Sequence, residues 1–201
     1  MRLRRVGACV VVVLALAGLS ACRTKAGAAA FVGGHRITDG DVNKYLTVKS
    51  TPYTNQSGTE VRPRSVVLAT LIQEQLLEKA LVAKGGAPTD AELGKLKDSV
   101  LQGATDEQLT SQITGSNFKA AFEPLYIRSQ ELFGLFGQRT KAQSSEELVA
   151  ALDKIGVRVQ VSSRYGTWDS AQLALQNGLD PDLSGVLTLD PTTSAAPSPQ
   201  P

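Results

Sequence analysis

Apolar residues recur at helical spacing through the middle of the chain and alternate with polar residues in short runs nearer its ends. The strongest helical pattern covers residues 63–84, between Pro63 and the pair Gly85-Gly86, which are start and stop signals of a helix. Its apolar stripe is too wide for a coiled-coil seam, which predicts a central helix with several neighbours. The stripe consists of Val66, Val67, Leu68, Leu71, Ile72, Leu76, Leu77, Ala80, Leu81 and Val82.

Three further helices are predicted from capping boxes, in which a Ser or Thr precedes a Glu or Gln by three residues. The boxes lie at residues 89–92, 105–108 and 144–147. The second helix is expected to end near residue 113, and the third at Gly156, because glycine is the usual residue after a helix.

Two more helices follow from single capping residues. Thr38 is expected to cap a helix with Val42, Tyr45, Leu46 and Val48 on one side, followed by a polar loop over residues 50–62. A longer helix over residues 117–138 is expected to begin at a Ser116 cap and to kink at Pro124. Its apolar side would contain Phe118, Ala121, Phe122, Leu125, Tyr126, Leu132, Phe133 and Phe136.

Strand signals occur at both ends of this helical region. Residues 29–32 and 35–37 flank Gly33-Gly34, which predicts a small β-hairpin. Val157, Val159 and Val161 alternate with polar residues, which is typical of a half-buried strand. The predicted fold class is therefore mainly α with a small β-sheet.

The first 22 residues have the layout of a secretory signal. Arg2, Arg4 and Arg5 precede an apolar stretch at residues 10–19, which is too short to span a bilayer as a stable helix. The sequence LSAC at residues 19–22 resembles the lipobox of bacterial lipoproteins. The resemblance implies a diacylglyceryl group on the sulfur of Cys22, cleavage before it, and a new N-terminus open to acylation. The alternative is an ordinary secretory peptide with a chance cysteine.

Composition changes once residues 1–21 are removed as a signal peptide. Their removal takes away three arginines and leaves 18 basic against 19 acidic side chains, a net charge of −1 instead of +2. The remaining sequence has no cluster of basic residues that would indicate binding to nucleic acid. Cys9 is lost with the signal and Cys22 carries lipid, so the folded part has no disulfide and no cysteine-based metal site.

The chain divides into a signal peptide (1–21), a tether (22–28), a helical domain (29–170), a C-terminal extension (171–188) and a tail (189–201). The tail contains Pro191, Pro197, Pro199 and Pro201 among Ser, Thr and Ala. Such a segment has too little apolar area to offset its ordering entropy, so it is predicted to be disordered.

Two segments at opposite ends of the domain carry motifs of a known family. Residues 30–42, AFVGGHRITDGDV, resemble the opening strand and helix of SurA-type chaperones, with Gly33-Gly34 where Asn-Gly is usual. The long helix and the sequence PTDAEL at 88–93 resemble its second and third helices. Residues 159–168, VQVSSRYGTW, resemble the closing VNPRYGxW strand of SurA-like lipoproteins of actinobacteria, with Ser162-Ser163 in place of Asn-Pro.

The resemblance implies a SurA-like helical chaperone module in which the closing strand pairs with the N-terminal hairpin. Gly34, Ile37, Arg164, Tyr165 and Gly166 match its structural motifs. Longer relatives carry a parvulin prolyl isomerase domain before the closing strand. Here residues 139–156 alone occupy that interval, far below the roughly 50 residues of a small domain. The protein is therefore not expected to be an enzyme.

No catalytic residue, metal site, cofactor or small-molecule substrate is predicted. His35 is the only histidine, and its acidic neighbours read as turn and cap residues. In the sequence RYGTW at 164–168, the favoured interpretation packs Tyr165 and Trp168 against the helices, and the alternative makes them an exposed aromatic contact. The apolar side of the helix predicted at residues 117–138 also has two interpretations. It packs in the core, or part of it lines a groove that binds unfolded client polypeptides. The candidate client-binding residues are Phe118, Phe122, Tyr126, Phe133, Phe136 and Trp168.

These observations predict an extracytoplasmic lipoprotein, held at the cell membrane by lipid on Cys22, that binds unfolded or partly folded exported proteins through an apolar groove. Such binding needs no chemistry, because loss of apolar hydration drives it. The alternative function is a non-catalytic envelope scaffold with one specific partner.

Overall fold

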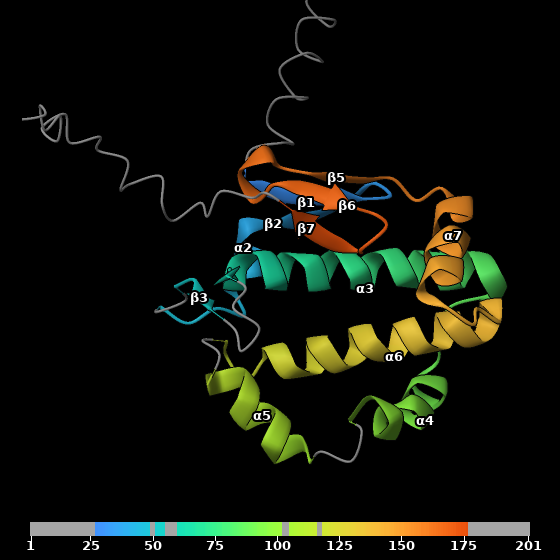
Figure 1. Ribbon diagram of the computed structural model, residues 1–201, viewed down its shortest axis with the longest axis horizontal. Coiled ribbons are helices and arrows are strands. Elements are labelled where there is room, and N and C mark those ends of the chain that lie inside the picture. Colours follow the sequence, from blue (N-terminus) through green and yellow to red (C-terminus); the bar gives the residue numbers. More distant parts are fainter. Residues whose placement is uncertain (1–26, 49–50, 55–59, 102–104, 116–117, 177–201) are drawn as a thin grey trace, which may run out of the picture.

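The computed structural model describes residues 27–48, 51–54, 60–101, 105–115 and 118–176 of the chain. Their fold is mainly helical with a small antiparallel sheet (Figure 1). The sheet lies on one side of α3 (Pro63–Gly85), and α6 (Phe122–Thr140) lies along the other side. Beyond α6 lie α4 (Asp90–Leu101) and α5 (Asp106–Gly115). The two long helices therefore form the centre of the molecule.

The sheet joins the N-terminal hairpin to a strand that comes late in the described chain. Its strands are β1 (Ala28–Val32), β2 (His35–Thr38) and β5 (Val159–Val161), in the order β2-β1-β5. Gly33 and Gly34 make the predicted hairpin turn with φ of 53° and 84°, which glycine adopts without strain. Ala30 pairs with Val161, and Val32 with Val159. The expected pairing of the closing strand with the N-terminal hairpin is confirmed.

Helix α2 (Asp39–Asn43) is capped as predicted but is shorter than expected. The Thr38 hydroxyl accepts from the Asp41 N–H, and the Thr38 N–H donates to the Asp41 carboxylate at 2.8 Å. The chain then leaves the helix because the carbonyl of Tyr45 accepts from the N–H of Lys119 at 2.8 Å. Val48, expected on the helix, is fully exposed outside it.

The predicted polar loop over residues 50–62 contains a two-stranded pair. Its strands are β3 (Tyr53–Thr54) and β4 (Glu60–Val61), which are antiparallel. Each has two residues, too short for the alternating pattern that marks a strand in a sequence.

Helix α3 matches its prediction, and Arg139 of α6 ties its end to α4. The Arg139 guanidinium donates to the carbonyl of Gly86 at 2.7 Å and to the carboxylate of Glu92 at 2.9 Å. Glu92 also accepts from Thr89 in the predicted capping box. These hydrogen bonds hold the pKa of Glu92 at about 2. One arginine thus fixes the turn between two helices.

Helix α6 begins at Phe122, later than predicted. Phe118 lies in an isolated β-bridge with Leu46 instead of in the helix, so the prediction of a helix from residue 117 is wrong. Pro124 is in the first turn, where backbone N–H groups have no partner within the helix, so it removes no hydrogen bond and gives no reason for a kink. The predicted Ser116 cap lies outside the described residues.

The remaining elements close the fold. Helix α7 (Ser145–Ile155) has the predicted Ser144 cap, and Gly156 ends it in the left-handed conformation. After β5 come the 3₁₀ turn η1 (Ser163–Tyr165), β6 (Thr167–Asp169) and β7 (Ala174–Gln176). The β6–β7 hairpin extends the described fold beyond residue 170, where the helical domain was expected to end.

Candidate functional site

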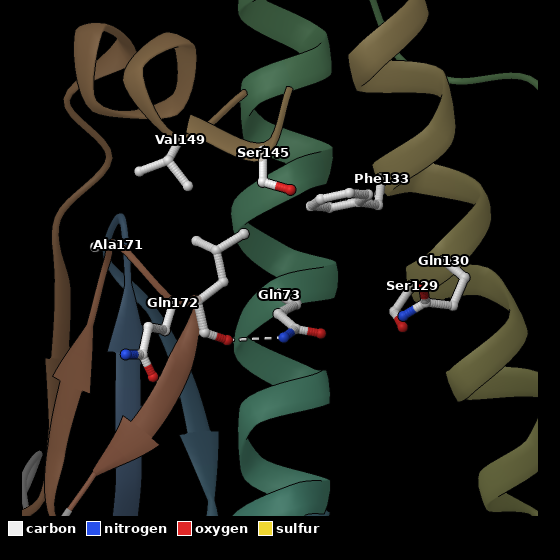
Figure 2. Close-up of a pocket in the computed structure, with 9 residues that line it drawn as sticks. Gln73, Ser129, Gln130, Phe133, Ser145, Val149, Ala171 and Gln172 are labelled. Carbon is white, nitrogen blue, oxygen red and sulfur yellow. Dashed lines mark hydrogen bonds between the residues drawn. The ribbon is translucent and has the colours of Figure 1, made fainter. Parts of the chain in front are cut away.

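A cavity of about 270 Å³ opens beside α3 and α6, next to α7 and the β6–β7 turn (Figure 2). Its lining mixes amide and hydroxyl side chains with apolar ones. The lining residues are Gln73, Ser129, Gln130, Phe133, Ser145, Val149, Ala171, Gln172 and Leu173. None of them carries a charge.

One face of α6 supplies a wall of the cavity. Phe133 is three residues from Gln130 and four from Ser129, a spacing that places it on the same side of the helix as each of them. Figure 2 shows all three extending from α6 toward α3. Ser129 is buried and its hydroxyl donates to the carbonyl of Tyr126 at 2.8 Å, whereas Phe133 is half-buried. Phe133 is therefore the aromatic side chain that the cavity leaves open to a ligand.

The β6–β7 turn supplies the facing wall and is held by Asp169. The carboxylate of Asp169 accepts from the N–H groups of Ala171 and Gln172 at 2.8 and 3.2 Å, an arrangement typical of an Asx turn. Leu173 follows with φ of 49°, and its carbonyl accepts from the Gln73 amide at 2.8 Å. The turn is thereby connected directly to α3.

The chemistry of this lining favours an uncharged ligand with both polar and apolar parts. Glutamine amides donate and accept hydrogen bonds, as a peptide group requires. Phe133, Val149 and Leu173 offer apolar surface. A buried charge without a partner is costly, so the lining disfavours acidic and basic side chains. A peptide group with an apolar side chain fits these conditions.

Charged residues of the two long helices pair with one another. Arg128 of α6 lies 3.2 Å from the Glu74 carboxylate and 2.7 Å from that of Glu78, both on α3. Burial raises the pKa of Glu74, and the neighbouring charge of Glu78 raises it further. This ion-pair group connects α3 to α6 and leaves the cavity lining neutral.

The arginine and tyrosine of the RYG motif form a second polar group, which joins the closing segment to α2. Nη2 of Arg164 lies 2.6 and 2.5 Å from the two carboxylate oxygens of Asp39 and donates to the Ala28 carbonyl at 3.2 Å. The Tyr165 hydroxyl donates to Asp39 at 2.8 Å, and the tyrosine is 1% exposed. We call Asp39, Arg164 and Tyr165 the end lock.

Tyr165 predicts a loss of stability at alkaline pH. Burial, aided by the hydrogen bond to Asp39, raises the pKa of Tyr165 to about 12. Between pH 10 and 12 the folded protein keeps a proton that the unfolded chain loses, so stability falls as pH rises, by up to about 2–3 kcal/mol. Urea unfolding from pH 9 to 12 should show this fall, and Tyr165→Phe should reduce it. Equal slopes for the two proteins would contradict the assignment.

The candidate client-binding residues separate into two groups. Phe118, Phe122 and Phe136 are 5%, 3% and 0% exposed, so of the two interpretations of this apolar side they fit the core, and their candidate role in client binding is wrong. Phe122 and Phe136 lie in the core because α6 is covered by α3 on one side and α4 on the other. Phe118, outside the helix, stacks on Phe122. Tyr126 is exposed, whereas Phe133 and Trp168 are half-buried. Only Phe133 lines the cavity.

The motif residues lie where a structural role needs them. Gly34 is in the hairpin turn, Ile37 is buried in the core, and Gly166 follows η1 with φ of 98°. Tyr165 packs into the body, as the favoured interpretation of its motif expected. His35 is exposed on β2, and the candidate lipid site Cys22 lies outside the described residues.

Sequence reasoning missed the glutamines of the cavity and the part played by Asp169. Gln73, Gln130 and Gln172 lie on three separate elements, and no spacing in the sequence links them. The aspartate before Ser170 and Ala171 is a turn signal that was available, because Asp commonly accepts from backbone N–H groups two residues on.

No family model, curated protein or solved structure matches this chain. Among the described residues, no group of three or more His, Cys, Asp or Glu side chains is placed to hold a metal ion. No helix within the described ranges combines the length and apolar character needed to cross a membrane.

Proposed function

We propose that the protein is a lipid-anchored extracytoplasmic lipoprotein with a SurA-like chaperone module, which binds unfolded or partly folded exported polypeptides without chemistry. The lipobox-like sequence before Cys22 supports the anchor. The meeting of the two SurA-like segments in one sheet supports the kinship, because that family builds one module from both ends of its chain. Relatives carry a parvulin domain at the position of residues 139–156, where this chain has α7 and the short segments beside it.

The observation that carries the proposal is the uncharged cavity with Phe133 on its wall. A holdase must recognise what unfolded segments share, which is exposed peptide groups and apolar side chains. The glutamine amides can form hydrogen bonds with exposed peptide groups, and Phe133 and Val149 can contact apolar side chains. This cavity replaces the broad apolar groove expected from the sequence, and it limits each contact to a short stretch of client.

The test is suppression of aggregation of an unfolded client by the soluble mature chain. Truncating an aromatic contact at the centre of a site typically weakens binding about tenfold or more, which is about 1.4 kcal/mol. Phe133→Ala should therefore need about ten times more protein for the same suppression. The cavity is uncharged, so raising the salt concentration should change suppression little.

Val82→Ala is the matched control, because Val82 is an apolar residue that is 57% exposed on α3 and does not line the cavity. It should suppress as the parent does, and circular dichroism should show that both variants are folded. Absence of suppression by the folded parent at molar excess would contradict the holdase. Capture of a single saturable partner would instead favour an envelope scaffold.

A further inference from the structure

One edge of the three-stranded sheet has no partner among the described residues. Strand β1 is in the middle of the sheet, so β5 presents an outer edge. Toward β1, the N–H of Ser162 donates to the carbonyl of Ala29 at 2.9 Å. Residues that form such bonds alternate along an antiparallel pair with residues whose N–H and C=O groups point away. The backbone groups of Val159 and Val161 therefore face outward, on either side of Gln160.

The edge formed by β5 is uncharged and lies beside a hollow of about 390 Å³. Strand β6 also borders the hollow, but it pairs with β7 in a separate sheet and does not satisfy the edge. The lining includes the half-buried side chains of Val159, Val161 and Trp168. Charged side chains commonly keep the edge of a sheet from pairing, and Arg36 lies on β2 at the opposite edge. The Val-Gln-Val sequence of β5 has no such protection.

The outward backbone groups of β5 are symmetric about Gln160. When a second copy of β5 runs antiparallel across a two-fold axis at Gln160, Val159 of each copy lies opposite Val161 of the other. Residues opposite each other at such a position exchange both of their hydrogen bonds. Four hydrogen bonds then form between the copies, and no outward backbone group of Val159 or Val161 is left without a partner.

The side chains of β5 suit the same arrangement. On the two-fold axis Gln160 faces its own copy, where a charged side chain would meet a like charge. The amide of Gln160 is exposed and can both donate to and accept from the identical amide. Val159 and Val161 are on the other face of the strand, where each meets the other across the pair and beside the hollow.

We propose that two copies of this chain associate through β5, so that the three-stranded sheet of one copy continues into that of its partner. Each copy contributes a strand of three residues, whereas a stable interface typically uses about 20–30 residues a side. The dimer is therefore weak and forms at high local concentration. Strand β5 does not line the cavity that contains Phe133, so this pairing and client binding can fail independently.

Disulfide trapping tests the pairing, because a covalent bond captures a weak contact. The chain from residue 22 onward, made with Cys22→Ser, contains no cysteine, and Gln160→Cys then introduces a single thiol. Residues that face each other at a non-hydrogen-bonded position have Cα atoms about 4.5 Å apart, which a disulfide can bridge. We expect this variant to form a covalent dimer under mild oxidation.

Arg158→Cys is the matched control for the trapping experiment. Arg158 is exposed on the same face of the chain as Gln160 and two residues from it. In the proposed dimer the two copies of residue 158 lie on opposite sides of the axis, about 14 Å apart along the strands, too far for a disulfide. Gln160→Cys should therefore dimerise at least about tenfold faster than Arg158→Cys, because pairing raises the local concentration of its partner thiol. Equal rates would indicate random collision and overturn the proposal.

Tryptophan fluorescence tests the pairing without a crosslink. Trp168 is the one tryptophan of the chain and lines the hollow. Pairing should exclude water from it, so its emission should move to shorter wavelength as Cys22→Ser protein is concentrated from about 1 μM to 1 mM, the range of weak complexes. Gln160→Lys puts like charges on the axis and should abolish this shift, whereas Gln160→Asn should keep it. Emission that does not depend on concentration, or that shifts only when an unfolded client is added, would overturn the proposal.

Discussion

Replacing Cys22 by serine is expected to abolish lipid attachment when the protein is made in a bacterial host. The proposed diacylglyceryl group is joined through sulfur, which serine lacks. Each buried CH₂ contributes about 0.8 kcal/mol to membrane binding, and two or more acyl chains give a stable anchor. Loss of the lipid therefore removes nearly all affinity of the mature chain for the membrane.

Metabolic labelling with an alkyne palmitate, followed by detergent phase partitioning, measures this effect. The parent should carry the label and enter the detergent phase, and Cys22→Ser should show neither. Cys9→Ser is the matched control, because Cys9 is the other cysteine of the chain and lies in the segment predicted to be cleaved. Label on Cys22→Ser, or loss of label from Cys9→Ser, would contradict the prediction that the lipid is attached to Cys22.

The helices were predictable wherever local signals agree with burial. Pro63 at the start of α3 and Gly86 after its end, together with its apolar stripe, identified that helix almost to the residue. The capping boxes that begin at Thr89 and Thr105 form the hydrogen bonds that their spacing predicts. Such signals involve residues three or four apart, so they can be read from the chain without knowledge of its tertiary contacts.

Errors arose where a long-range contact overrides a local pattern. Phe118 has helical spacing relative to Phe122, yet the strand-like bridge to Leu46 holds it outside the helix. The same contact shortens α2. The rings of Phe118 and Phe122 stack with their centroids 4.6 Å apart. The prediction that the two residues pack together was therefore correct, whereas the prediction that both lie on one helix was wrong.

The candidate site was less predictable than the fold for the same reason. Of six proposed client-binding residues, Phe133 alone lines the cavity. An apolar stripe does not reveal whether it faces a core or a groove, because both give the same helical spacing. The polar members of the cavity come from α3, α6 and the β6–β7 turn, and tertiary packing alone brings them together.

Tyr165→Ala is expected to have the largest effect on stability within the described fold. Truncation of a fully buried aromatic residue typically costs about 3–5 kcal/mol, because it removes apolar burial and leaves a cavity. Tyr165 is also part of the end lock, so its loss leaves Asp39 with one hydrogen-bond donor fewer. Tyr165→Phe keeps the ring and should cost only about 1 kcal/mol.

Urea unfolding monitored by circular dichroism measures these differences. Tyr126→Ala is the matched control, because Tyr126 is 38% exposed on α6 and should cost about 1 kcal/mol or less. A double-mutant cycle of Asp39→Ala with Tyr165→Phe isolates the hydrogen bond between them, with an expected coupling of about 0.5–3 kcal/mol. A Tyr165→Ala cost no greater than that of Tyr126→Ala would mean that the closing segment does not hold the two chain ends together.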